Sequence, residues 1–165
     1  MKCNNKEIFE KQNVFGMGEP NTTYAKYFIG ESFLNPLTDS QSDLFAANVT
    51  FEPGCRNNWH IHHSTKGGGQ LLLCIAGEGW YQEEGKSAVG LKAGSVVMIP
   101  PNVKHWHGAK KDSWFSHIAI EVPGENCDNE WCEPVTEEEY NKLQGGIRYG
   151  YKTNGRKRFF GRICP

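Results

Sequence analysis

Apolar and polar residues alternate in short runs through the middle of the chain, from about residue 44 to residue 123. Alternation with a period of two is typical of strands that are buried on one face, and Gly, Pro or Asn separates the runs. The runs read LFAANVTFEPG, NWHIHH, QLLLCIAGEGWYQEEG, AVGLKAGSVVMIPPN, VKHWHGA and SWFSHIAIEVPG. This regular punctuation predicts an all-β fold, an antiparallel sandwich or barrel.

The segments on either side of these runs have weaker patterns. We expect a strand near TTYAKYFIG, followed by a connection rich in Pro, Asp and Ser. A helix is expected only late in the chain, at VTEEEYNKLQGG, where Thr136 and Glu139 can form a capping box and Gly145 can end the helix. One structural domain is therefore expected, with an N-terminal segment and edge strand (1–43), a barrel (44–123), and an acidic linker, helix and basic tail (124–165).

Composition and charge limit the partners of the protein. A chain of 165 residues with 38% apolar residues can build one packed core, and a net charge of -1 argues against coating nucleic acid or an anionic membrane. The polar N-terminus has no signal-peptide core, and the longest apolar run, LLLCIA, is far shorter than a membrane span. We therefore expect a cytoplasmic protein that binds neither nucleic acid nor a membrane. The basic stretch from Ile147 onward is interpreted as a solvated or dimer-contacting tail rather than an RNA-binding arm.

Six cysteines occur at irregular spacing, at positions 3, 55, 74, 127, 132 and 164. A chain of this length without a secretion signal favours free thiols over a disulfide scaffold. Cys127 and Cys132 form the only close pair, and zinc ligation there would need two further ligands that the neighbouring sequence does not offer. Cys74 is expected to be a small buried residue rather than a ligand or nucleophile.

Histidines recur at alternate positions of the predicted strands, so several of them are expected to face one interior. His60 and His62 alternate along one run, and His105 and His107 along another. Two further interior faces are expected to carry Gln70, Leu72 and Cys74, and Phe115, His117, Ala119 and Glu121. Three imidazoles with one oxygen ligand leave coordination positions of a metal open for water or substrate. The alternative is that each histidine makes a local hydrogen bond and that no metal binds.

Two motifs resemble those of the cupin superfamily. The run from Gly54 to Gly77, Gly-x5-His-x-His-x7-Gln-x6-Gly, is similar to the first cupin motif, with Gln70 where most members have Glu. The run GSVVMIPPNVKHWHGA is similar to the second motif, with His105 as its histidine, although Asn102 and Ala109 depart from the usual Gly and Asn. The resemblance covers about residues 20 to 143 and implies a double-stranded β-helix, the cupin jelly-roll barrel, with a short C-terminal helix.

Further stretches sharpen this resemblance. VTFEPG, GEGWYQEEG, SHIAIE and EPVTEEEY are similar to small single-domain bacterial cupins, a subgroup that includes manganese-dependent hydroxynitrile lyases and cupins associated with carboxymuconolactone decarboxylases. This implies metal ligation by His60, His62, Gln70 and His105, with Mn as the expected ion and Fe, Ni, Zn and Co as alternatives. It also implies that His117 is the acid or base. A substrate pocket is expected to be lined by Ala47, Val49, Leu72, His107 and Phe115.

Two departures from the subgroup concern this site. The loop before Gln70 is longer than usual, so His63 could replace Gln70 as a ligand or remain an exposed loop imidazole. Glu121 could orient His117 or act as a second base, or it could lie solvated at the barrel mouth, paired with Arg or Lys. An amide ligand in place of a carboxylate leaves more charge on a divalent ion, which favours anionic substrate groups.

Glycine and tryptophan residues near the site have simpler interpretations. Gly67 to Gly69 are expected to let the chain turn toward the metal, rather than to cradle a phosphate, because no P-loop Lys-Ser/Thr follows. The tryptophans of opposite parity or at strand ends are expected to pack in the core or a dimer contact, and these are Trp59, Trp80, Trp106 and Trp114.

The functional expectation is a metal-dependent lyase that acts on a C–C bond of a small, anionic or oxygenated substrate, by hydroxynitrile-lyase-like or decarboxylase-like chemistry. The alternatives are an Fe-dependent dioxygenase and a non-catalytic cupin that binds a small molecule or metal. A homodimer is expected, with the segment around Tyr24 to Phe28 pairing with a partner's sheet.

Overall fold

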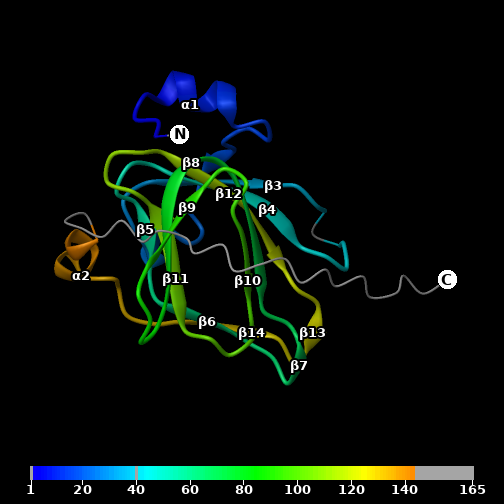
Figure 1. Ribbon diagram of the computed structural model, residues 1–165. Coiled ribbons are helices and arrows are strands. Elements are labelled where there is room, and N and C mark those ends of the chain that lie inside the picture. The colour runs from blue at the N-terminus through cyan, green and yellow to red at the C-terminus, as the bar shows by residue number, and fades with distance from the viewer. Residues whose placement is uncertain (1, 40, 144–165) are drawn as a thin grey trace, which may run out of the picture.

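The long strand β8 (Gln70–Glu83) organises the fold (Figure 1). In the computed structural model, which describes residues 2–39 and 41–143, its first half pairs with β12 (Phe115–Glu121) and β10 (Val96–Ile99). Its second half pairs with β11 (His105–Ala109) and β9 (Val89–Lys92). Because β8 belongs to both layers, the antiparallel sheet curls around a shared interior, and the predicted all-β antiparallel barrel is confirmed.

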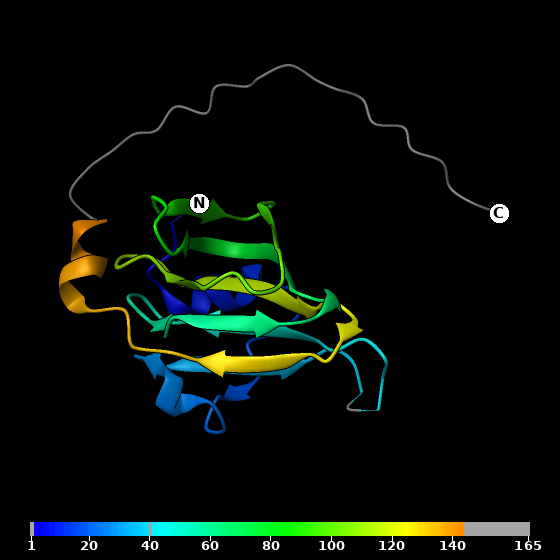
Figure 2. The same cartoon turned by 90° about the horizontal axis from the view of Figure 1, so that it is seen from below.

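Shorter strands complete the two layers (Figure 2). The layer that contains β12 continues through β4 (Ala46–Phe51), β3 (Ser32–Pro36) and β1 (Glu19–Pro20). The layer that contains β11 includes β2 (Phe28–Ile29), β5 (Arg56–Asn57), β6 (His60–His63) and β14 (Asp128–Trp131). A separate pair joins β7 (Lys66–Gly67) to β13 (Gly124–Glu125). Every one of these pairings is antiparallel.

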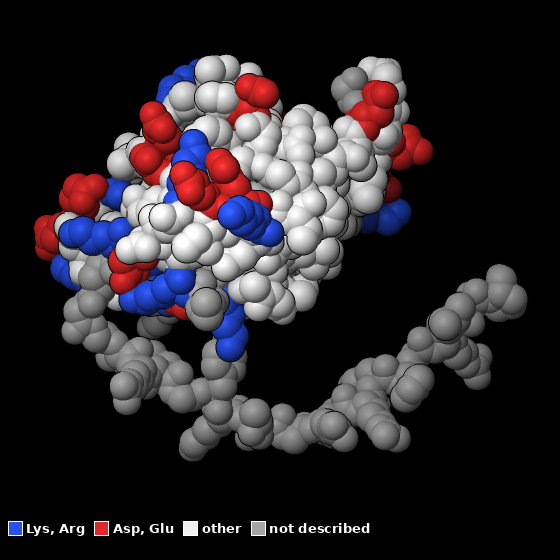
Figure 3. Space-filling view, turned by 90° about the horizontal axis from the view of Figure 1, so that it is seen from above, with Lys and Arg blue, Asp and Glu red and all other residues white. Residues whose placement is uncertain are grey.

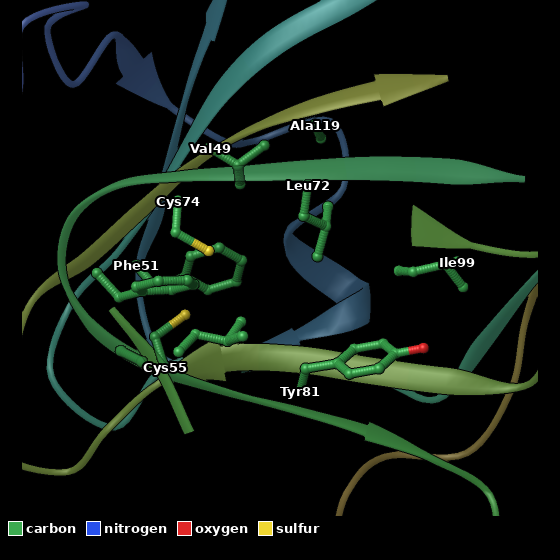
Figure 4. Packing of buried hydrophobic residues seen from close by; sticks show 11 residues of the cluster. Val49, Phe51, Cys55, Leu72, Cys74, Tyr81, Ile99 and Ala119 are labelled. Carbon is green, nitrogen blue, oxygen red and sulfur yellow. The ribbon is translucent and has the colours of Figure 1, made fainter. Parts of the chain in front are cut away.

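Much of the barrel interior is filled by an apolar core (Figure 4). Phe51, Leu72 and Phe115 are all 0% exposed in this cluster, whose members come from both layers. Cys74 lies here as predicted, and burial raises the pKa of its thiol to about 12. All five described cysteines are free thiols, whereas Cys164 lies outside the described residues.

A helix near the N-terminus was not predicted. α1 (Lys6–Gln12) is capped by the side chain of Asn5, which accepts a hydrogen bond from the N–H of Ile8. Phe9 is its one buried residue and packs against Trp114, with ring centroids 5.7 Å apart. A helix of seven residues with a single buried position has no apolar stripe that a sequence pattern could reveal.

The strand expected near TTYAKYFIG is mostly wrong. Residues 22–24 form a turn, a short 3-10 helix η1 (Ala25–Tyr27) follows, and only Phe28 and Ile29 are extended. Those two residues pair with β5 of the same chain, so this segment already has a strand partner. Aromatic residues favour strands by composition, but here the aromatic side chains of Tyr27 and Phe28 pack around Trp131 instead.

The predicted C-terminal helix is present as α2 (Glu137–Lys142), and the capping box between Thr136 and Glu139 is confirmed. The buried Tyr140 donates a hydrogen bond to the carbonyl of Ala109 and packs with Trp59, Trp106 and Val135. Gly145 and the basic stretch from Ile147 onward lie outside the described residues. Within the described part of the chain, neither α-helix is long or apolar enough to traverse a bilayer.

Candidate metal centre

Three buried histidines meet at the other part of the barrel interior. His60 and His62 alternate on β6, and His105 on β11 lies directly opposite His60 in the strand pairing. Their exposed fractions are 3%, 6% and 0%, and one ligand atom from each lies within 4.8 Å of the others. The strand parity of the sequence therefore brings these imidazoles to one point.

Hydrogen bonds to the backbone orient two of the rings. His60 Nδ1 donates to the carbonyl of Asn58 at 3.0 Å, and His105 Nδ1 donates to the carbonyl of Val103 at 2.8 Å. Each ring therefore keeps a lone pair on Nε2, which is the form that binds a metal. Burial lowers the pKa of His105 to about 4 and the pKa of His60 well below its usual value, so both rings are neutral at physiological pH.

Gln70 supplies an oxygen beside these rings. Its Nε2 donates to Oε1 of Glu121 at 3.2 Å, while its Oε1 is buried without a hydrogen-bond partner. Nε2 of His105 and both ring nitrogens of His62 are also buried without a partner. Unpartnered buried acceptors are costly, and a bound cation would satisfy Nε2 of His105, one ring nitrogen of His62 and the amide oxygen together. The donor set of three imidazoles and one amide oxygen thus fits a divalent metal ion.

The triple glycine places Gln70 at this position. Gly69 has a φ of +91°, and a Cβ there would lie 2.3 Å from the backbone oxygen of Ile99. A side chain is excluded by this close approach, which lets the chain turn tightly into β8. The interpretation of the glycines as a turn toward the site agrees with this geometry.

His63 does not join the group. It follows His62 on β6 and so points to the other face, where Nε2 lies 2.7 Å from Oε2 of Glu130 and Nδ1 lies 3.1 Å from Oδ1 of Asn102. The hydrogen bond to Glu130 raises the pKa of His63. His63 therefore points away from the three histidines, and its ring has a polar partner at each nitrogen.

A cavity of about 420 Å³ opens next to the candidate ligands. Three residues of the predicted pocket, Ala47, Val49 and His107, line it together with His60, His62 and Gln70. The prediction is wrong for Leu72 and Phe115, which share the interior parity but lie deeper, in the fully buried core. Parity decides which face a side chain takes, but not how far along the barrel the cavity extends.

One wall of the cavity is aromatic, and no sequence pattern predicted it. Trp131 on β14 stacks on His60, with centroids 4.9 Å apart, and on Tyr27, with centroids 4.5 Å apart. Tyr24, Phe28 and Phe45 also line the cavity. β14 lies in the acidic segment, whose exposed residues show no alternation, so a tryptophan among acidic residues was its only signal. The other four tryptophans pack elsewhere, as predicted.

His107 and His117 form a buried pair behind the cavity. Nε2 of His117 lies 3.1 Å from Nδ1 of His107, so one ring donates to the other. His107 lines the cavity, whereas His117 is 0% exposed and lies between His107 and Phe51. Burial lowers the pKa of His117 to about 3 and the pKa of His107 well below its usual value, so both are neutral at physiological pH.

Glu121 has neighbours that neither sequence interpretation anticipated. Its Oε1 accepts from Gln70, and its Oε2 lies 3.0 Å from Nδ1 of His62, although that ring is not aligned for a hydrogen bond. His117 is four residues away on the same strand, a separation of about 13 Å along the backbone. Glu121 therefore faces the candidate ligands, rather than His117 or a solvated Arg or Lys.

Comparison with known proteins agrees with this architecture. A model of the cupin domain family matches residues 47–120. The (R)-mandelonitrile lyase of Granulicella tundricola is 38% identical over 120 residues, which is 72% of this chain and 88% of that protein. A cupin-like protein from Thermotoga maritima is also 38% identical, with a TM-score of 0.70 over 82% of this chain and 99% of that one.

A more distant solved structure shows the fold alone. A cupin 2 conserved barrel domain protein from Rhodopseudomonas palustris is 15% identical, with a TM-score of 0.56 over 76% of this chain and 81% of that one. The barrel topology, the histidine group and the two relatives at 38% identity lead to the same conclusion. The chain belongs to the cupin family.

Proposed function

We propose that this protein is a metal-dependent lyase that breaks a C–C bond next to a hydroxyl group, in the manner of a hydroxynitrile lyase. The observation that carries this proposal is the buried donor set of His60, His62, His105 and Gln70, three of which have buried polar atoms without a hydrogen-bond partner, beside a cavity with a histidine on its wall. The similarity to a protein named (R)-mandelonitrile lyase supports the same reaction class.

The four candidate ligands would hold a divalent ion, for which we propose Mn²⁺. Imidazole nitrogens and an amide oxygen also suit Fe, Co, Ni and Zn, so the native ion has to be measured. When bound, the ion supplies positive charge that stabilises the negative charge developing on the substrate oxygen. Since the described ligand set contains no carboxylate, that charge is reduced only by the nearby Glu121.

The residues of the cavity account for the remaining requirements of the reaction. His107 borders the cavity, so its ring can exchange a proton with a substrate hydroxyl, and His117, with Nε2 3.1 Å from Nδ1 of His107, fixes the orientation of that ring. As the C–C bond breaks, its electron pair leaves with cyanide, the oxygen becomes the carbonyl of an aldehyde, and the proton returns to cyanide. The wall of Tyr24, Phe28 and Trp131 would receive the carbon skeleton and exclude water.

Cyanide release from mandelonitrile tests this proposal. We expect release above background that requires added Mn²⁺, and we expect the double variant His60→Ala, His62→Ala to lose both the bound ion and the activity while it remains folded. His63→Ala is the matched control, because His63 lies outside the ligand group and should keep both. Elemental analysis, circular dichroism and a cyanide assay give the three readouts.

Two outcomes would contradict the proposal. A double variant that retains stoichiometric metal would show that the ligands are elsewhere. Metal binding without turnover on any cyanohydrin or β-dicarbonyl substrate, across several metals, would favour a binding cupin instead.

A further inference from the structure

The candidate ligands fall into two pairs according to what holds them. His60 and His105 each donate Nδ1–H to a backbone carbonyl, so the main chain sets their orientation. Gln70 and His62 have no such backbone partner. The side chain that lies beside both of them is Glu121, with Oε1 3.2 Å from Nε2 of Gln70 and Oε2 3.0 Å from Nδ1 of His62.

Gln70 needs orienting because its amide has two different ends. The oxygen can bind a cation, whereas the NH₂ group repels one. A carboxylate accepts hydrogen bonds and cannot donate them, so only the NH₂ end of Gln70 can face Glu121. This contact leaves Oε1 of Gln70 as the end that is available to an ion, and that oxygen is buried without a hydrogen-bond partner.

The contact is built into the strand pairing. Gln70 is the first residue of β8 and Glu121 is the last of β12, and the two residues lie directly opposite each other. Side chains directly opposite on antiparallel strands lie about 5 Å apart at Cβ, which makes such pairs interact. Gln70 is 5% exposed, and Glu121 is the only acidic residue among the described residues that line the cavity.

We propose that Glu121 is a positioning residue of the metal centre, which turns the oxygen of Gln70 toward the ion. With this pair, the amide of Gln70 would bind the ion, and the carboxylate of Glu121 would contact that amide without binding the ion itself. This inference rests on the metal centre of the proposed function, but not on its lyase chemistry.

A cycle of variants at the two positions tests the inference. In Glu121→Gln, the new amide can both donate and accept hydrogen bonds, so either end of the Gln70 amide can turn toward the ion. The Mn²⁺ affinity should therefore fall by about 10- to 100-fold. In a Gln70→Glu background the ligand is an acceptor at both oxygens and needs no orienting. There, the further change Glu121→Gln should alter the affinity by less than about 3-fold, because a carboxylate at position 70 presents an oxygen to the ion whichever way it turns.

Metal-free protein is titrated with Mn²⁺ at one pH to measure the affinity. Calorimetry and electron paramagnetic resonance of the free ion are the two readouts of this titration. Glu130→Gln is the matched control, since it removes a carboxylate that contacts His63 outside the group, and it should leave the affinity unchanged. Circular dichroism of each metal-free variant establishes that it is folded. The double variant Gln70→Glu, Glu121→Gln keeps the hydrogen bond with donor and acceptor exchanged, so it also rescues the pair if the single variant folds poorly.

The two backgrounds separate orientation from simple charge. If Glu121 acted only through its negative charge, Glu121→Gln would weaken binding equally in both backgrounds, and that result would overturn the inference. If Glu121→Gln left the Mn²⁺ affinity unchanged in both backgrounds while cyanide release persisted, only the positioning role would be refuted. If Glu121→Gln weakened Mn²⁺ binding only in the background that has Gln70, but the protein released no cyanide, the lyase proposal would be refuted and the positioning role would stand.

Discussion

Burial decides the charge state of the histidines that the sequence places in the interior. His117 is 0% exposed and its pKa is lowered to about 3, whereas the half-exposed His63 beside Glu130 has a raised pKa. Two residues of the same type therefore respond to acid in opposite ways. The neutral state of His117 is what allows it to share one hydrogen with His107.

The pH dependence of stability should report the burial of His117. Its pKa is about 3 in the folded chain and about 6.5 in the unfolded chain, so between these values the unfolded chain binds the extra proton. The contribution of His117 to stability is then fully present above pH 6.5 and is lost as pH falls toward 3. In metal-free His117→Gln, the free energy of unfolding should fall less steeply between pH 6 and pH 4, by up to about 1.4 kcal/mol per pH unit.

Urea titrations of metal-free protein at several pH values give this slope. The control is His63→Gln, which should not flatten the acid slope, because a raised pKa contributes stability below the unfolded value and loses it as pH rises. An unchanged slope in His117→Gln would mean that His117 is already protonated in the folded protein.

At the scale of elements, the segment after the barrel is anchored by a buried cation. Arg56 on β5 is 2% exposed, and its Nε and Nη2 both donate to the carbonyl of Val135, each at 3.1 Å. Its guanidinium lies over the ring of Tyr140 and also meets Glu137 at the start of α2. This one side chain joins the sheet to the chain entering α2.

Removing Arg56 should therefore cost more than removing its acidic partner. Arg56→Ala leaves the carbonyl of Val135 without a partner and opens space against Tyr140, so we expect a loss of about 2–4 kcal/mol in the free energy of unfolding. Glu137→Ala should lose far less, because its side chain is 69% exposed and water replaces the ion pair. Chemical denaturation of both variants checks this order, and equal losses would show that the ion pair, rather than the buried contacts, carries the stability.

At the scale of the whole molecule, an apolar face lies on the outside of one layer. Val96 and Met98 on β10 are 66% and 60% exposed. They lie opposite Leu73 and Leu71 on β8, which in turn lie opposite Ile118 and Ile120 on β12. Exposed apolar side chains that lie together, as Val96 and Met98 do, mark association sites. Separately, the side of the molecule where α1 lies has a broad area without Lys, Arg, Asp or Glu (Figure 3).

We expect a homodimer through this outer face, and the segment from Tyr24 to Phe28, which pairs with β5 along one edge, is the alternative contact. The double variant Val96→Glu, Met98→Glu should halve the mass measured by light scattering after size-exclusion chromatography. Val89→Glu is the control, since Val89 is 44% exposed on β9, which pairs with the other half of β8. A wild-type protein that is monomeric at high concentration would contradict this expectation.

Local spacing along the chain determined much of the candidate site. Period-two alternation predicted the antiparallel barrel, and the same parity put His60, His62 and His105 on faces that share the interior. The capping box at Thr136 is likewise a local pattern, and it was predicted correctly. These features depend on residues close together in sequence, where backbone geometry alone sets the direction of the side chains.

Tertiary structure alone decided which side chains meet from distant strands and how deep each one lies. Glu121 faces Gln70 because of the register between β12 and β8, and Trp131 reaches His60 because β14 pairs with β6. Leu72 and Phe115 share the parity of the cavity residues but are enclosed by the core. Register and depth are set by packing between segments far apart in the chain, and alternation within one strand carries no information about either.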